Sequence, residues 1–110
     1  MIAHPSNLVL PWCQRAMPTR AIENGVYAVT TNRIGEEARP PRPTLGFTGG
    51  SLIVDPLGDS LAAAPADDEA ILVATIDVAR ARDKSLPSGN DRIRERKPAA
   101  YARLVSEEVE

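Results

Sequence analysis

Apolar residues recur at helical spacing between residues 12 and 24. They fall three or four positions apart on one helical face, and they are Trp12, Ala16, Met17, Ala21 and Ile22. Gly25 follows directly, and glycine is the residue that most often ends a helix. The pattern therefore predicts an amphipathic helix over residues 12–24, which Pro18 either kinks or divides.

Short strand patterns flank this helix on both sides. Ile2 and Ala3 read as the end of a strand that enters a loop at residues 4–7, and residues 26–31 are rich in β-branched and aromatic side chains. A strand, a helix and a second strand in this order favour parallel strands joined by a crossover helix. The predicted fold class is therefore α/β.

The middle of the chain divides into a loop and a hairpin. Residues 35–50 contain three prolines and several glycines with little apolar periodicity, which predicts a long surface loop. The sequence Asp55-Pro56-Leu57-Gly58 then has the residues of a type I turn between two short strands, at 51–55 and 59–63.

The second half begins with an apolar run. Residues 70–76 are almost all apolar, which predicts a strand buried on both faces. Asp77 is a suitable N-cap for a short basic helix over residues 78–82, which residues 87–90 end.

Composition limits the fold and the compartment. A length of 110 residues is sufficient for one modest domain, and an aromatic content of 4% predicts a thin aliphatic core. A net charge of −2 gives no attraction to nucleic acid or anionic lipid. We find no export signal and no membrane-spanning segment, and the single cysteine allows no intrachain disulfide, so we expect a reducing, cytoplasmic location.

The candidate chemical groups are few. Cys13 and His4 are the only cysteine and histidine, but Trp12 and Met17 beside Cys13 favour a structural thiol over a catalytic dyad. The glycine-rich residues 46–51 precede a strand, which indicates a tight bend and not a phosphate-binding loop. Seven basic residues between 80 and 97 alternate with acidic ones and predict a solvated or partner-facing surface.

Five groups of residues, taken in order, resemble the carbon-nitrogen hydrolase (nitrilase) superfamily. They are the segment 4–14, the helix end Arg20-Ala21-Ile22-Glu23-Asn24 with residues 26–35, the bend 47–51 with the hairpin Ile53-Val54-Asp55-Pro56 and Gly58, the strand 72–77, and Arg96-Lys97-Pro98 with Tyr101. The resemblance makes residues 1–101 the C-terminal portion of such a domain and residues 102–110 an acidic tail.

The resemblance implies part of a four-layer αββα sandwich, with a crossover helix and a C-terminal β-meander. Enzymes of this family cleave nitriles, amides or carbamoyl groups with a Cys nucleophile, a Glu and a Lys, and without a cofactor. In this family all three residues lie upstream of the segment that residues 4–14 resemble, and the context of Cys13 does not match that of the family's nucleophile. We therefore expect a partial hydrolase, truncated at a false start or split from its first half, that is inactive alone.

The resemblance also suggests a binding site and a partner. Asn7 and Trp12 occupy the segment that borders the substrate pocket in the family, although Asn7 could instead cap a turn and Trp12 could pack the helix. The expected partners are a nitrile or amide substrate in the intact enzyme and a second copy of the chain, with no nucleic acid or membrane. The alternative function is a non-catalytic dimerisation or interaction module.

Overall fold

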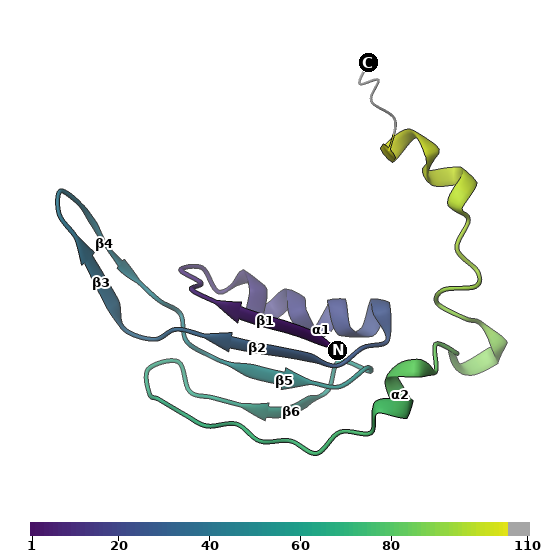
Figure 1. The fold of residues 1–110 in the computed structure, drawn as a ribbon, viewed down its shortest axis with the longest axis horizontal. Coiled ribbons are helices and arrows are strands. Elements are labelled where there is room, and N and C mark those ends of the chain that lie inside the picture. The colour runs from purple at the N-terminus through teal and green to yellow at the C-terminus, as the bar shows by residue number, and fades with distance from the viewer. Residues whose placement is uncertain (106–110) are drawn as a thin grey trace.

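A computed structural model describes residues 1–105, apart from the side chains of residues 88 and 103 (Figure 1). It is a mixed α/β structure, as the sequence predicts. The elements in chain order are β1 (Ile2–Ser6), α1 (Trp12–Asn24), β2 (Ala28–Asn32), β3 (Glu36–Arg39), β4 (Arg42–Gly46), β5 (Leu52–Val54), β6 (Ser60–Ala63), α2 (Val78–Arg82), and the 3₁₀ helices η1 (Pro87–Gly89) and η2 (Pro98–Val105). None of the helices within residues 1–105 has the length and hydrophobicity that crossing a bilayer requires.

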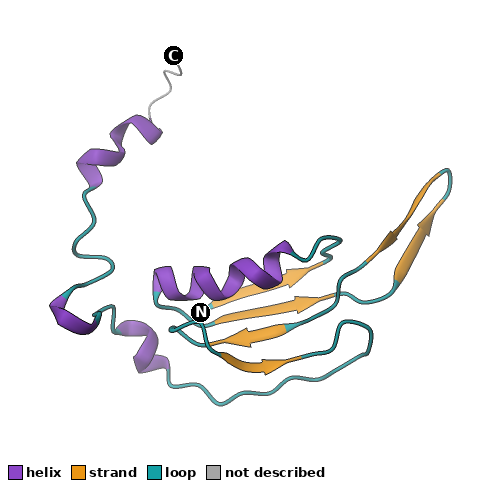
Figure 2. Ribbon diagram, turned by 180° about the vertical axis from the view of Figure 1, so that it is seen from behind, coloured by secondary structure: helices purple, strands orange, loops and turns teal. Residues whose placement is uncertain are grey.

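The main sheet has four strands in the order β1-β2-β5-β6. Strands β1 and β2 are parallel, and α1 connects them across one face of the sheet, which confirms the predicted crossover helix (Figure 2). The core between α1 and the sheet consists of Ala21, Ala28 and Val54, with Met17 and Leu52 packed against them. These side chains are aliphatic and mostly small, so the core is thin, as the composition predicts.

Strand β1 is longer than the sequence pattern indicates. It continues to Ser6, which pairs with Asn32, so the predicted loop at residues 4–7 is wrong for residues 4–6. Pro5 does not prevent this, because β1 lies at the edge of the sheet and an edge strand tolerates a residue without a backbone donor.

The predicted end of α1, the turn residues and the N-cap of α2 are confirmed, but α2 has Asp83 as its C-cap and is not ended by residues 87–90. Gly25 ends α1 in the left-handed conformation with φ 56°. The Asp55 carbonyl accepts the Gly58 amide at 3.0 Å, which closes the turn between β5 and β6. Asp77 caps α2 by accepting the backbone N–H of Ala79 at 2.9 Å.

The predicted long loop at residues 35–50 is wrong, because β3 and β4 form a separate two-stranded antiparallel sheet. This hairpin projects away from the main sheet (Figure 1), so neither of its faces requires an apolar stripe. Glu37 forms ion pairs with Arg33 and Arg39, each at 2.5 Å. The Arg33 guanidinium also lies 4.3 Å from the centroid of the Phe47 ring. Polar contacts therefore replace the hydrophobic alternation that sequence analysis looks for.

The predicted buried strand over residues 70–76 is also wrong. This segment is extended but pairs with no strand among the described residues, and Ile71 is 94% and Val73 83% exposed. The segment runs alongside β6 toward α2 in both ribbon views (Figures 1 and 2). The alternating apolar residues of this segment favour an extended backbone. A β-strand also requires a neighbouring strand with which its backbone can form hydrogen bonds. The predicted C-terminal β-meander therefore ends with the β5–β6 hairpin.

Long-range contacts connect the region around α2 to the sheet. The Arg80 guanidinium bonds to the Asp55 carboxylate at 3.0 Å, and the Tyr27 hydroxyl donates to the Asp77 carbonyl at 3.1 Å. Lys84 Nζ donates to the carbonyls of Asn24 at 2.9 Å and of Gly25 at 2.7 Å. These carbonyls lie at the C-terminal end of α1, where a cation is favoured by the helix dipole.

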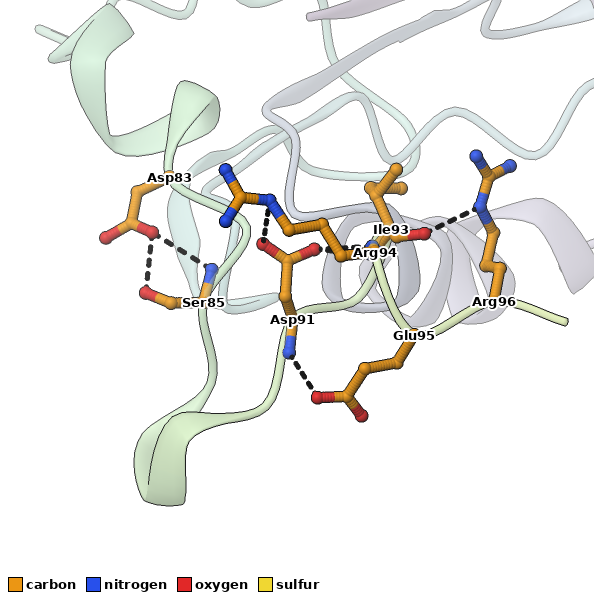
Figure 3. A network of polar contacts seen from close by, with 7 residues as sticks. All are labelled: Asp83, Ser85, Asp91, Ile93, Arg94, Glu95 and Arg96. Carbon is orange, nitrogen blue, oxygen red and sulfur yellow. Dashed lines mark hydrogen bonds and ion pairs between the residues drawn. The ribbon is translucent and has the colours of Figure 1, made fainter.

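Beyond α2, two aspartates organise the chain through local turns (Figure 3). The Asp83 carboxylate accepts the Ser85 hydroxyl at 2.6 Å and the Ser85 amide at 2.9 Å. The Asp91 carboxylate accepts the amides of Ile93 and Arg94, both at 2.8 Å. Most of the predicted acidic tail, residues 106–110, lies outside the described residues.

These turns are expected to loosen in acid. The hydrogen bonds from Ser85 hold the pKa of Asp83 below its ordinary value of 3.8, and the backbone amides of Arg94 and Ile93 do the same for Asp91. A lowered pKa means that the stabilisation is present above the ordinary carboxyl range and is lost as the pH falls through the lowered value. An NMR titration should therefore show the Ser85 and Ile93 amides shifting with midpoints below 3.8.

Asp83→Asn and Asp91→Asn are the matched controls, because each removes one titrating group and retains an acceptor oxygen. Each should abolish only its own titration. Midpoints at or above 3.8 would contradict the assignment of these carboxylates as the groups that order the turns.

Candidate functional site

The carboxyl ends of the two parallel strands lie side by side. Ser6, the last residue of β1, pairs with Asn32, the last residue of β2. In α/β sheets, ligands bind outside the carboxyl ends of parallel strands. The predicted pocket residues both lie at this edge, because Asn7 directly follows β1 and Trp12 is the first residue of α1. We refer to residues 6–14, 32–33 and 47–51 as the carboxyl edge.

Asn32 is the central polar residue of the carboxyl edge. Its Oδ1 accepts the backbone N–H of Leu8 at 2.8 Å. Its Nδ2 donates to the Gly49 carbonyl at 2.7 Å and to Thr48 Oγ1 at 3.0 Å. One amide side chain at the end of β2 therefore connects the loop after β1 to the bend before β5.

Gln14 and Thr48 complete this network. Gln14 Nε2 donates to Thr48 Oγ1 at 2.8 Å and to the Gly49 carbonyl at 3.0 Å, and Thr48 Oγ1 in turn donates to the Leu8 carbonyl at 3.0 Å. Gln14 Oε1 is buried and has no hydrogen-bond partner among the described residues. A buried acceptor without a partner costs free energy. The two hydrogen bonds donated by Nε2 must therefore offset this cost and hold the side chain in place.

Sequence analysis assigned no role to Asn32, Gln14 or Thr48. All three fall in segments that carry the family resemblance, but the partners of Gln14 and Thr48 in this network lie up to 40 residues away along the chain. Hydrophobic periodicity and turn residues describe relations between positions a few residues apart, so they do not predict contacts between residues this distant in the sequence.

A cleft of about 710 Å³ adjoins the carboxyl edge on the β2 and β5 side. Its lining combines one basic residue, two acidic residues and several small or apolar ones: Asn32, Arg33, Ile34, Ser51, Ala64, Pro65, Asp68, Glu69, Ala70 and Ile71. The positive charge of Arg33 is partly compensated by Glu37, whose pKa is lowered by its hydrogen bonds from Arg39 and Arg33. The lining of the cleft therefore combines charged residues of both signs with apolar residues.

Asn7 and Trp12 lie at the carboxyl edge but do not line this cleft. Asn7 is exposed and Trp12 is 67% exposed, so the tryptophan does not pack into the core. The N-cap of α1 is Pro11, with no side-chain cap, so Asn7 does not cap the helix. Both side chains are thus available to solvent next to the ends of the parallel strands.

His4 and Cys13 do not form a dyad. His4 lies on β1, where its Nδ1 is 3.3 Å from Thr30 Oγ1, and Cys13 is half-buried in the first turn of α1. No hydrogen bond joins them among the described residues. The geometry agrees with the sequence-based preference for a structural cysteine.

Residues 1–84 match the family model of the carbon-nitrogen hydrolases, and the chain therefore belongs to this family. It is 44% identical over 103 residues to a nitrilase of Pyrococcus abyssi (strain GE5 / Orsay), covering 94% of this chain and 37% of the relative. A carbon-nitrogen hydrolase crystal structure from Helicobacter pylori G27 superposes with a TM-score of 0.70 at 32% identity, covering 87% of this chain and 34% of that chain.

The resemblance in the sequence to this superfamily is thus confirmed. The chain spans about a third of the length of these two relatives, 37% and 34% respectively.

Proposed function

We propose that this chain supplies the C-terminal part of a hydrolase of non-peptide carbon–nitrogen bonds in nitriles, amides or carbamoyl groups. The observation that carries the proposal is the match of residues 1–84 to the carbon-nitrogen hydrolase family. The architecture supports it, because one helical layer on one face of the main sheet is the arrangement expected of half of a four-layer αββα sandwich. In this proposal the other two layers come from residues outside the 110.

The proposed reaction uses a cysteine thiolate that lies outside this chain. The thiolate attacks the amide carbon, the nitrogen takes a proton from a glutamic acid and leaves as ammonia, and a lysine stabilises the oxyanion. Water then cleaves the thioester, which releases the carboxylic acid and regenerates the thiol. In this scheme Asn7 and Trp12 border the substrate, because they lie exposed at the carboxyl edge.

The test is to assay ammonia release from a nitrile, a primary amide and an N-carbamoyl compound. The chain is assayed alone and after co-expression with the part of the Pyrococcus abyssi nitrilase that it does not match. We expect no turnover by the chain alone and measurable turnover by the co-purified complex. Cys13→Ala should change the rate of the complex less than about threefold, whereas loss of a true nucleophile costs several orders of magnitude.

Two outcomes would contradict the proposal. Turnover by the chain alone that disappears in Cys13→Ala would show that the nucleophile is Cys13. A stable complex that hydrolyses none of the three substrate types would remove the support for hydrolysis and leave the interaction module as the function.

A second candidate function is a non-catalytic dimerisation or interaction module. The observation that favours it is the exposure of apolar side chains along residues 70–76, where Ile71 is 94% and Val73 83% exposed. Size-exclusion chromatography with light scattering separates the two candidates. A stable homo-oligomer of the chain alone favours the module, and aggregation favours an incomplete enzyme.

A further inference from the structure

The loop between β1 and α1 has its backbone held by residues that are distant in the sequence. The N–H of Leu8 donates to Asn32 Oδ1 at 2.8 Å, and the carbonyl of Leu8 accepts the Thr48 amide at 2.9 Å and the Thr48 hydroxyl at 3.0 Å. Both backbone polar groups of the residue that follows Asn7 are therefore paired. A loop of this kind on a protein surface normally leaves such groups to water.

The other end of the loop is held by the same hydroxyl group. Thr48 Oγ1 accepts from Asn32 Nδ2 at 3.0 Å and from Gln14 Nε2 at 2.8 Å, and it donates to the Leu8 carbonyl. A threonine hydroxyl has one donor and two acceptor positions, so all three are in use. Residues 8–14, which include Trp12, are thus fastened at both ends to one side chain.

We infer that Thr48, Asn32 and Gln14 are positioning residues that set the conformation of residues 7–12, which comprise the loop that begins at Asn7 and the first helical residue, Trp12. The consequence for substrate binding rests on the proposed function, whereas the positioning rests on the hydrogen bonds alone. The hydroxyl of Thr48 is the critical group, since its removal takes away three of the hydrogen bonds of the network in a single substitution.

The first test measures the loop in the full chain. Trp12 is the only tryptophan, so its fluorescence anisotropy reports on the loop without labelling. In Thr48→Val we expect lower Trp12 anisotropy and about tenfold faster hydrogen exchange of the Leu8 amide, the change that corresponds to the loss of one or two hydrogen bonds. Thr48→Ser keeps the hydroxyl and should restore both values.

A matched control separates positioning from general destabilisation. Thr30→Val removes another threonine hydroxyl, which lies 3.3 Å from His4 Nδ1 and outside the network. Thr30→Val should leave Trp12 anisotropy and Leu8 exchange unchanged. Equal effects of the two valine variants on the loop would overturn the inference, as would a Thr48→Ser variant that behaves like Thr48→Val.

Gln14→Leu is a second variant that tests the same positioning role, in case Thr48→Val does not fold. It removes the anchor at the α1 end and leaves the bonds of Leu8 in place. We expect lower Trp12 anisotropy with a smaller rise in Leu8 exchange than in Thr48→Val, because Gln14→Leu leaves the hydrogen bonds of Leu8 to Asn32 and Thr48 in place. Unchanged anisotropy in Gln14→Leu would overturn the inference.

The second test uses the hydrolytic complex described above. There Thr48→Val should raise KM about fivefold and change kcat less than about twofold, because a misplaced loop weakens substrate binding more than chemistry. An unchanged KM together with a loosened loop would overturn the link to substrate. If the parent complex is inactive, the proposed function fails, while the fluorescence and exchange measurements still decide the positioning role.

Discussion

Replacing Gly49 with alanine is expected to lower the free energy of unfolding by at least about 3 kcal/mol, because it combines backbone strain with a steric clash. Gly49 has φ +52°, and a Cβ there would lie 2.0 Å from the Ala66 carbonyl oxygen and 2.6 Å from its carbon. These are backbone atoms and cannot turn aside. The clash would also displace the Gly49 carbonyl that Asn32 and Gln14 bind. Urea denaturation followed by circular dichroism measures the loss.

Two other glycines serve as graded controls for this effect. Gly35 also has a positive φ, +77°, but no atom lies within 4 Å of a Cβ built there. Gly35→Ala should therefore cost only the backbone strain, about 1–2 kcal/mol. Gly46 has neither the strain nor the close contact, so Gly46→Ala should be near neutral. If Gly49→Ala lowers the free energy of unfolding no more than Gly35→Ala does, close packing against Ala66 is not the reason that position 49 requires glycine.

Replacing Asp55 with alanine is expected to cost about 2–4 kcal/mol, because it leaves two backbone amides and a guanidinium without their acceptor. Asp55 is 3% exposed. Its Oδ1 accepts the amides of Leu57 at 2.8 Å and Asp59 at 3.1 Å, and its Oδ2 accepts from Arg80 at 3.0 Å. The substitution therefore removes the support of the β5–β6 turn and a link to α2. Thermal and urea denaturation measure the effect.

Two variants separate the contribution of Asp55 to the turn from its contribution to the ion pair with Arg80. Asp55→Asn keeps an acceptor for the two amides and should recover most of the lost stability. Arg80→Ala removes only the ion pair. The Arg80 side chain is 48% exposed, but the Asp55 side chain is 5% exposed and loses its cation, so we expect a cost of about 1–2 kcal/mol. If Asp55→Asn is as harmful as Asp55→Ala, the charge and not the turn is the main contribution.

Gly49 and Asp55 lie at opposite ends of β5, and only the bend at Gly49 belongs to the carboxyl edge, because Val54 pairs with Ala28 at the amino end of β2. Gly49 brings the bend before β5 against Ala66, and Asp55 closes the hairpin that follows. The bend carries Thr48, the hydroxyl that fastens the loop bearing Trp12. A change at Gly49 can therefore reach the proposed substrate-facing residues through Thr48, Asn32 and Gln14, whereas Asp55 supports the opposite end of the sheet.

The sequence by itself determined the elements that depend on near neighbours. Helix α1 with its end at Gly25, the turn from Asp55 to Gly58 and the cap at Asp77 each rest on contacts within a few residues. The stop, turn and capping preferences of glycine, proline and aspartate are local properties of the backbone. The ordered family segments added the resemblance to the carbon-nitrogen hydrolases, which the family match confirms.

Only the tertiary structure decided where these elements meet. It paired residues 36–46 into a hairpin that has no apolar alternation, and it left residues 70–76 extended without a paired strand among the described residues. It also brought Gln14 and Leu8, 34 and 40 residues from Thr48 in sequence, to a single hydroxyl. Such contacts depend on the packing of the whole sheet, and no preference of a single residue type specifies its partner at that distance.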